Sequence, residues 1–156
     1  MKKITTLFFL SCTIILLSSC SSSKNSTDLK TSTRNLSGVW TITDITLDLP
    51  SDFKVSDVFD EAPYQDFMNS KWDLKRNGKG FFALTNGTTR DIYWSVYGKG
   101  SDAQFQFKKL LGEKARNVDL GYRLDITNIS TNMFVGKTPI DMGNGNTGYI
   151  TYTFTK

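Results

Sequence analysis

Apolar and polar side chains alternate along most of the chain between residues 39 and 155. Short runs of β-branched and aromatic residues are separated by Asn, Gly and Asp, a pattern typical of antiparallel strands joined by tight turns. Eight strands are expected, over residues 39–47, 70–75, 79–85, 89–97, 103–110, 120–128, 132–137 and 148–155. The pattern predicts an all-β fold, an antiparallel up-and-down barrel of about eight strands, with a two-sheet sandwich as the alternative.

Two local signals refine this arrangement. Asn77-Gly78 lies between two strand patterns and predicts a two-residue hairpin turn with positive φ at both residues. Residues 55–62 form the only stretch with a helical pattern, where Ser56 is a suitable N-cap and Asp57 favours the positive end of the helix. Pro63 bounds this short helix, which lies in the long connection between the first two strands and is placed to cover a barrel mouth.

Alternation also predicts which face of each strand is buried. The expected inward set is Trp72, Leu74, Phe82, Leu84, Ile92, Trp94, Val96, Phe105, Phe107, Leu120, Tyr122, Leu124, Ile126, Ile150, Tyr152 and Phe154. Within it, seven large aromatic residues form the candidate ligand pocket: Trp72, Phe82, Trp94, Phe105, Phe107, Tyr122 and Tyr152. These rings line an apolar pocket for one small hydrophobic ligand, or they fill the interior, which their size favours. Tyr93 and Tyr97 are expected to face outward, where they offer a surface to a protein or glycan partner.

The N-terminal segment has the pattern of a lipoprotein signal peptide. Lys2 and Lys3 precede an apolar run over residues 4–17, which is too short to span a bilayer comfortably and ends in Leu17-Ser18-Ser19-Cys20. Cleavage is expected between Ser19 and Cys20, and the Cys20 thiol then takes acyl chains such as palmitate. A plain signal peptide, or an uncleaved N-terminal anchor, is the alternative.

The organisation expected from these patterns has three parts. Residues 1–19 form the signal peptide, and residues 20–35 form a lipidated flexible tether rich in Ser, Thr, Asn and Lys. Residues 36–156 form one β-barrel domain. The mature chain is thus expected to be anchored to a membrane by its N-terminal lipid without spanning it.

Charge and residue inventory exclude several classes of function. The chain has no histidine, and its two cysteines are lost to the signal peptide (Cys12) and to the lipid (Cys20), which excludes Ser-His triads, thiol nucleophiles and typical zinc sites. Without Lys2 and Lys3, 17 basic residues face 15 acidic ones, a balance that does not favour nucleic-acid binding. The one local basic stretch comprises Lys108, Lys109, Lys114 and Arg116, and it is a solvated loop or, alternatively, a contact for membrane phosphates.

Three further patterns are weak as signs of chemistry. Gly143-x-Gly145-x-x-Gly148 matches the dinucleotide fingerprint, but a strand pattern follows it where a helix is required, so a glycine-rich hairpin loop is expected. Asp57, Asp60, Glu61 and Asp66 lack the alternating spacing of a calcium loop and indicate a solvated helix face. Glu61 and Glu113, the only glutamates, do not form a convincing glycosidase pair. No enzyme activity, metal or cofactor is expected.

A family resemblance begins at Leu36-Ser37-Gly38-Val39-Trp40. A Gly-x-Trp sequence at the start of the first long strand resembles the lipocalin and calycin families. Residues 67–72, Ile92-Tyr93-Trp94 and Tyr152-Thr153-Phe154-Thr155 look like the lipocalin-like lipoproteins of the Bacteroidetes. The resemblance implies a barrel over almost the whole folded region, in which Gly38 permits a tight start to the strand and Trp40 plugs the closed end.

The chain departs from that family pattern in three respects. It has no convincing counterpart of the second lipocalin motif, and the lipocalin disulfide is impossible here. The arginine that often stacks on the plug tryptophan is absent, and Lys156 is the nearest basic candidate. These departures affect the expected ligand more than the expected barrel, because a fold does not determine a function.

The sequence therefore predicts a lipid-anchored barrel that binds rather than catalyses. A small hydrophobic ligand is expected to enter near the connection over residues 49–67. The alternative is an envelope adaptor or inhibitor that binds another protein or a glycan through its outer surface, with no ligand pocket. Ser21-Ser22-Ser23-Lys24 lacks the acidic run usual in surface-exported lipoproteins of the Bacteroidetes, which favours the outer membrane facing the periplasm.

Overall fold

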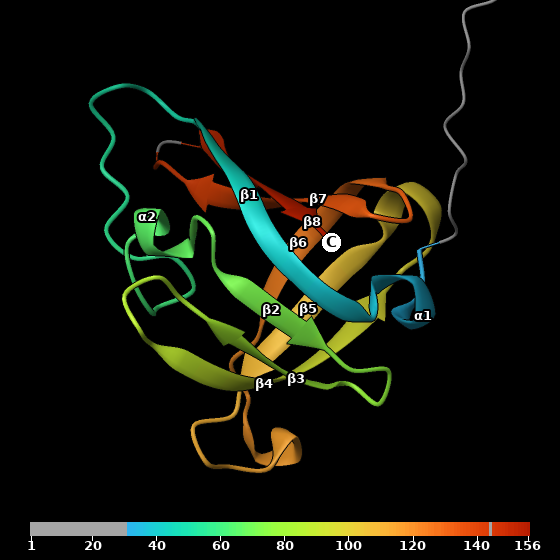
Figure 1. Ribbon diagram of the computed structural model, residues 1–156. Helices are drawn as coiled ribbons and strands as arrows, with labels where there is room; N and C mark the ends of the chain where they lie inside the picture. The colour runs from blue at the N-terminus through green and yellow to red at the C-terminus, as the bar shows by residue number, and fades with distance from the viewer. Residues whose placement is uncertain (1–30, 144) are drawn as a thin grey trace, which may run out of the picture.

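Eight strands form one closed antiparallel barrel in the computed structural model, which describes residues 31–143 and 145–156 (Figure 1). Each strand pairs with its neighbours in sequence, and β1 also pairs with β8. The strands are β1 (Gly38–Asp48), β2 (Lys71–Leu74), β3 (Lys79–Ala83), β4 (Thr89–Tyr97), β5 (Gln104–Lys109), β6 (Tyr122–Ile129), β7 (Met133–Asp141) and β8 (Thr147–Thr155). The predicted up-and-down barrel is confirmed, and the sandwich alternative is wrong.

Helical structure in the described residues is limited to short turns. These are α1 (Thr33–Leu36), α2 (Tyr64–Phe67) and the 3₁₀ turns η1 (Gly100–Asp102) and η2 (Ala115–Asn117). The first of them, α1, occupies the last residues assigned to the tether. The predicted signal peptide, Cys20 and tether residues 21–30 lie outside the described residues. No helix in the described part of the chain is long and apolar enough to cross a membrane.

The first strand closes the barrel because it serves two neighbours. Its first half pairs with β2, from Gly38↔Leu74 to Thr41↔Lys71, and its second half pairs with β8 as far as Asp48↔Tyr149. A register shift between Ile42 and Asp44 marks the bend between the two halves. All eight strands therefore have hydrogen-bonded neighbours on both sides, and the barrel has no open edge to which another strand could add.

The β2–β3 turn differs in detail from its prediction. Gly78 has a positive φ of 82°, but Asn77 does not have a positive φ. Lys75 and Lys79 close the turn by a backbone hydrogen bond of 2.9 Å, and the Asn77 side-chain oxygen accepts from the Lys79 N–H at 3.1 Å. The turn therefore has Arg76-Asn77 at its corner and Gly78 as a bulge residue, a common longer hairpin connection.

The helix predicted over residues 55–62 is wrong. Val58 and Ala62 form an isolated antiparallel bridge, and Phe59 and Asp60 between them have φ values of 54° and 48°. This tight turn directs the Phe59 ring into the barrel, so tertiary burial overrides the local helical pattern. A short helix does lie in this connection, but it is α2, which begins after Pro63, a residue well suited to the start of a helix.

The barrel interior contains the core predicted from alternation, with one error. Trp72, Phe82, Trp94, Phe105, Phe107, Leu124, Ile150 and Phe154 are among its buried members, while Leu120 is 59% exposed. The reason is that β6 starts only at Tyr122, so Leu120 lies beyond the rim of the sheet. The 49–70 connection adds Val58, Phe59, Ala62 and Phe67 to the core. Figure 1 shows α1 at one side of the barrel and this connection with α2 at the opposite side.

Candidate functional site

The seven residues of the candidate ligand pocket do come together inside the barrel. Six of them are at most 1% exposed, and Tyr122 is half-buried. The rings contact one another: Trp72 lies 4.8 Å from Phe82 and 5.3 Å from Phe107 between ring centres, and Phe107 lies 5.1 Å from Tyr122. Edge-to-face and tilted packing at these distances favours the interpretation in which the rings fill the interior.

The end of the barrel near α1 is closed around Trp40. This indole is fully buried, donates to the Leu36 carbonyl oxygen at 2.6 Å and meets the edge of Phe134 at 4.8 Å. Gly38 has a φ of 136°, and a β-carbon there would lie 2.9 Å from the Lys156 side chain. Trp40 thus fills the closed end, and Gly38 leaves room for the Lys156 side chain beside it.

The opposite end is covered by the 49–70 connection, from which the Phe59 ring enters the barrel. Phe59 lies 5.1 Å from Phe107, 5.5 Å from Tyr152, 5.5 Å from Phe67 and 5.6 Å from Tyr122, measured between ring centres. The sequence pattern had placed Phe59 on a helix and outside the candidate pocket. Its structural role is that of a plug over the predicted pocket residues.

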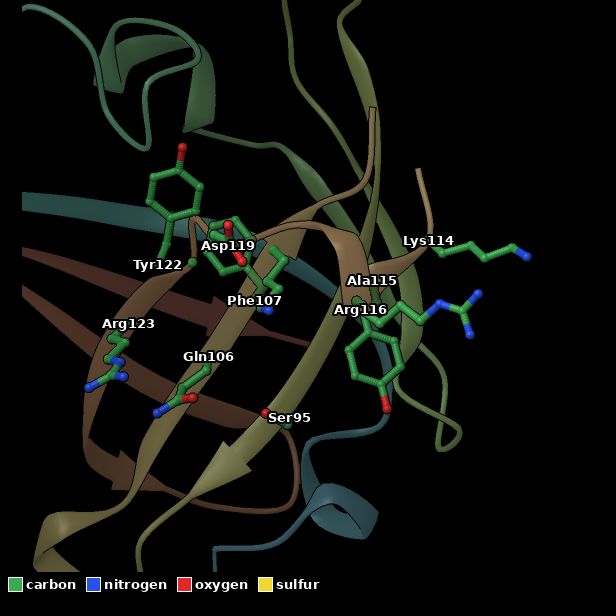
Figure 2. A pocket seen from close by; sticks show the side chains of 12 residues that line it. Ser95, Gln106, Phe107, Lys114, Ala115, Arg116, Asp119, Tyr122 and Arg123 are labelled. Carbon is green, nitrogen blue, oxygen red and sulfur yellow. The ribbon is translucent and has the colours of Figure 1, made fainter. Parts of the chain in front are cut away.

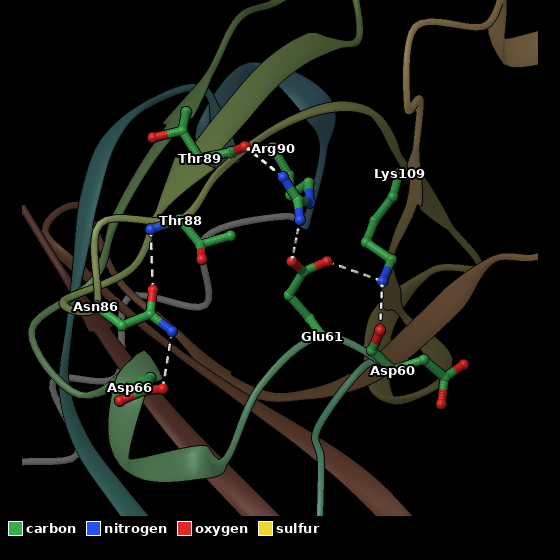
Figure 3. A network of polar contacts seen from close by, with 8 residues as sticks. All are labelled: Asp60, Glu61, Asp66, Asn86, Thr88, Thr89, Arg90 and Lys109. Carbon is green, nitrogen blue, oxygen red and sulfur yellow. Dashed lines mark hydrogen bonds and ion pairs between the residues drawn. The ribbon is translucent and has the colours of Figure 1, made fainter.

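A buried carboxylate holds this plug in place (Figure 3). Glu61, whose side chain is only 6% exposed, accepts from Arg90 of β4 at 2.9 Å and from Lys109 of β5 at 3.0 Å. Lys109 also donates to the Asp60 carbonyl oxygen at 2.8 Å, and the Tyr122 hydroxyl donates to the Asp60 carboxylate at 3.2 Å. Partial burial, followed by the nearby charge and hydrogen bond of Asp60 and the charge of Glu61, raises the pKa of Tyr122 to about 12.

The four residues of the acidic cluster in the sequence do not form one site, because each has different contacts. Glu61 forms the ion pairs, Asp60 accepts from Tyr122, and Asp66 accepts from Asn86 at 2.8 Å, while Asp57 is exposed. Among the described residues, no group of three or more His, Cys, Asp and Glu side chains is arranged to hold a metal ion. The cluster fastens the connection to the barrel, and the predicted solvated helix face is wrong because the helix does not form.

Two buried side-chain polar atoms of the described residues have no hydrogen-bond partner, Arg90 Nε and the Tyr152 hydroxyl. The three tryptophan indoles all donate, Trp40 to Leu36, Trp72 to the Ser70 hydroxyl at 3.0 Å and Trp94 to the Lys79 carbonyl oxygen at 3.2 Å. The Tyr152 hydroxyl, on a fully buried side chain, has no hydrogen-bond partner in the described part of the chain. Burial raises the pKa of Tyr152 far above its ordinary value. Buried polar groups without partners are uncommon in folded proteins, so this hydroxyl marks a point of interest.

A second feature lies outside the barrel. A groove of about 920 Å³ runs along the outer faces of β4, β5 and β6 and is bounded by the β5–β6 loop, residues 110–121 (Figure 2). Lys108, Lys114 and Arg116 of the predicted basic stretch line this groove, and the Lys108 ammonium donates to the Val118 carbonyl oxygen at 2.6 Å. Lys109 binds Glu61 instead. Arg123, Ser95 and Gln106 also line it, and the sequence pattern had not singled them out.

The glycine motif is part of a hairpin, as expected. It connects β7 to β8, which pair directly from Asp141↔Thr147 onward. The Asp141 carboxylate accepts from the Gly143 N–H at 2.8 Å. Because a strand follows the motif, the helix N-terminus that would hold a pyrophosphate is not formed there.

Comparison with known proteins finds no matching family model and no matching curated protein.

Proposed function

We propose that this chain is a membrane-anchored binding protein whose barrel takes a small apolar ligand that carries one hydrogen-bonding oxygen. The closed barrel and its aromatic interior support a binding role, and the Leu17-Ser18-Ser19-Cys20 sequence supports the lipid anchor. The observation that carries the proposal is the unpaired Tyr152 hydroxyl, buried beneath the Phe59 plug.

The ligand takes the place of the Phe59 ring. Removing this ring from the interior uncovers faces of Phe107, Tyr122 and Tyr152, which accept an apolar or aromatic group in its stead. A carbonyl or hydroxyl oxygen on the ligand then accepts from the Tyr152 hydroxyl. An unsatisfied buried polar group costs about 1–3 kcal/mol, and this penalty is relieved when the ligand binds.

The backbone of the plug lowers the cost of opening it. Phe59 and Asp60 are consecutive residues in the left-handed region, where a side chain costs about 1–2 kcal/mol per residue. Closing the turn is favoured by the buried Phe59 ring and by the ion pairs of Glu61. Backbone strain thus favours the open form of the connection, while ring burial and the ion pairs favour the closed form. A ligand that binds only the open form can therefore shift the balance between them.

Binding without chemical turnover fits the residue inventory. The chain has no histidine, and the interior groups that face the plug are aromatic rings and the Tyr152 and Tyr122 hydroxyls. The Tyr152 pKa is raised far above neutrality, so this hydroxyl acts as a hydrogen-bond donor and not as a base. Fixed apolar walls with one polar contact are typical of a ligand site.

Ligand titration tests the proposal. The whole chain with Cys20→Ser, which avoids acylation, is titrated with a fluorescent fatty-acid analogue, a haem and a set of aromatic metabolites. We expect saturable one-to-one binding of at least one probe, tighter binding by Phe59→Ala, and about tenfold weaker binding by Tyr152→Phe. Tyr149→Phe is the matched control, because Tyr149 lies on the same strand beneath Lys137 and outside the core. No saturable binding by either the parent chain or Phe59→Ala would refute the barrel ligand.

The anchor has a test of its own. Mass spectrometry of the mature chain is expected to show acylation at Cys20, and Cys20→Ser is expected to move the protein into the soluble envelope fraction. Protease treatment of whole cells then reports the face of the outer membrane, because a periplasm-facing domain is protected. An unmodified Cys20 contradicts the anchor while leaving the ligand experiment intact.

A further inference from the structure

The outer face of β4, β5 and β6 carries rows of side chains that run across the three strands. Ser95 is the register partner of Gln106, and Gln106 is the partner of Arg123. All three side chains point away from the core and line the groove beside the β5–β6 loop. Neighbouring strands lie about 4.8 Å apart, so this row places a hydroxyl, an amide and a guanidinium at regular intervals across the groove floor.

The two flanking rows differ from this central row. On one side, the Gln104 amide donates to the Asp125 carboxylate at 2.7 Å, and the Gln104 side-chain oxygen accepts from the Gln106 amide at 3.4 Å, which leaves the Gln106 side-chain oxygen facing the groove. On the other side, Lys108 is tied to the Val118 carbonyl oxygen at 2.6 Å, and Tyr93 beside it is 42% exposed. The central row with the Tyr93 ring at its border is therefore the part of the face that is available to a ligand.

The β5–β6 loop forms an ordered wall for this floor. It projects from the barrel in Figure 1, and its 3₁₀ turn η2 is closed by a hydrogen bond from the Asn117 N–H to the Lys114 carbonyl oxygen at 2.8 Å. The bond from Lys108 fastens the loop to β5. Figure 2 shows Lys114 and Arg116 extending from this loop, while Ser95, Gln106 and Arg123 come from the three strands.

The charge of the groove is unbalanced. Lys114, Arg116 and Arg123 line it, and in the described part of the chain none of them forms an ion pair, since the ion pairs found there all involve Glu61. Asp119 is the only acidic residue of the lining. A ligand that neutralises this site must carry negative charge, and the planar fork of Arg123 suits a carboxylate in particular.

From these features we infer that the groove binds a carboxylated glycan chain. An acidic peptide is another extended anion, but extended peptides gain affinity by adding a strand to a sheet edge, and every strand of this closed barrel already has two partners. A glycan needs no strand edge. Its carboxylates match Arg123 and the loop cations, its hydroxyls match Ser95 and Gln106, and the apolar face of a sugar ring packs on the exposed Tyr93 ring.

This inference goes beyond the barrel ligand and is independent of it. Phe107 and Tyr122 border both sites, but Tyr93 and Arg123 line the groove alone, whereas Phe59 and Tyr152 belong to the barrel interior alone. A failure of the barrel ligand therefore leaves the groove untouched, and the reverse also holds.

Calorimetric titration of the whole chain with Cys20→Ser tests the inference. The probes are polygalacturonate, alginate and hyaluronate, with neutral dextran for comparison. We expect saturable binding of at least one acidic glycan and none of dextran. Arg123→Gln and Tyr93→Ala are each expected to weaken this binding about tenfold, because they remove the carboxylate fork and the ring face.

Two matched controls make the result specific. Tyr97→Ala removes a more exposed tyrosine from the same strand and face but outside the groove, and Lys71→Gln removes an exposed cation from β2. Both are expected to bind within about twofold of the parent chain. Because the Tyr93 ring packs against Gly78, thermal unfolding is recorded for each variant, and Gln106→Ala replaces Tyr93→Ala if the latter does not fold.

Three outcomes overturn the inference. The first is that none of the three acidic glycans binds. The second is that polyglutamate binds as tightly as they do, which would show attraction to charge alone. The third is that the controls weaken binding as much as Arg123→Gln, which would place the contact elsewhere on the surface.

Discussion

The Lys156 ammonium lies 4.2 Å above the centre of the Trp40 ring and also donates to the Ser37 carbonyl oxygen at 3.1 Å. The end of β8 is thereby joined to the start of β1 at the closed end of the barrel. A cation over an indole contributes about 0.5–1 kcal/mol when exposed and about 2 kcal/mol when desolvated. Partial burial lowers the pKa of Lys156, which indicates that the ammonium has lost some of its hydration.

Removing this cation should destabilise the barrel. Lys156→Met is expected to lower the free energy of unfolding by about 1 kcal/mol, because it removes both the ring contact and the hydrogen bond. Lys156→Arg should retain most of the stability, since a guanidinium also stacks on an indole. Urea unfolding followed by tryptophan fluorescence measures the difference.

The matched control for Lys156 is Lys137, whose ammonium lies 3.8 Å above the Tyr149 ring on the outside of the barrel. Lys137→Met should lower the free energy of unfolding less than Lys156→Met, because the Lys137 pair does not contact Trp40 or the closed end of the barrel. Equal losses of unfolding free energy in the two variants would show that the contact with Trp40 stabilises the barrel no more than an ordinary surface pair.

Glu61 should act as the latch of the Phe59 plug. Glu61→Gln removes the charge that pairs with Arg90 and with the nearly buried Lys109, and we expect a loss of about 2 kcal/mol in unfolding free energy. Asp57→Asn, an exposed acidic residue of the same connection, should change stability by less than about 0.5 kcal/mol.

Hydrogen exchange distinguishes local opening at Glu61 from global destabilisation. The Val58 N–H donates to the Ala62 carbonyl oxygen at 2.8 Å and reports on closure of the turn. In Glu61→Gln this amide should exchange faster by more than the global loss accounts for. If protection of the Val58 amide relative to the barrel strands is unchanged, Glu61 does not hold the Phe59 turn closed.

Strand order and the buried face were predictable because local patterns encode them. β4 was predicted to its exact residues, since period-two alternation from Ile92 to Val96 is bounded by turn residues on both sides. Leu120 was misplaced because alternation continues past the point at which the chain leaves the sheet. Phe134 was not predicted as a core residue because Gly136 interrupts the apolar pattern of β7. A glycine is needed at position 136 because the Leu124 side chain occupies the space of a β-carbon.

The features that depend on contacts between distant segments could not be predicted. Residues 55–62 have a helical pattern, but burying Phe59 against β5, β6 and β8 outweighs it. The row of Ser95, Gln106 and Arg123 exists only through the pairing register of three strands. Local sequence carries no signal for such a register, although each residue's outward orientation follows from alternation.

The packing of β2 against β3 gives a prediction about two glycines. A β-carbon on Gly80 would overlap the Asp73 carbonyl oxygen, whereas one on Gly87 would meet nothing within 4 Å. Gly80→Ala should therefore cost about 2–3 kcal/mol by forcing the ladder apart. Gly87→Ala should cost only about 1 kcal/mol, the price of a φ of 91° for a residue with a side chain. Thermal and urea unfolding of the two variants compare them directly, and similar losses would contradict the overlap at Gly80.

The pH dependence of stability should reveal the two interior tyrosines. Burial raises the pKa of Tyr152, and burial with the charge of Asp60 raises that of Tyr122 to about 12. Above pH 10 the unfolded chain loses these protons while the native protein keeps them, so the native state binds more protons and stability falls as pH rises. The loss should begin near pH 10. The Tyr122 part should be complete near pH 12, while the Tyr152 part continues at higher pH.

Replacing the hydroxyls separates their contributions. At pH 8 without ligand, Tyr152→Phe should be as stable as the parent chain or up to about 1–2 kcal/mol more stable, because it removes an unsatisfied buried hydroxyl. Its alkaline loss should be smaller, and Tyr122→Phe combined with Tyr152→Phe should nearly abolish the decline between pH 10 and pH 12. Urea unfolding at a series of pH values measures both effects. If Tyr152→Phe is strongly destabilised at pH 8, its hydroxyl is already satisfied in the empty barrel, and the ligand contact proposed for it is lost with that result.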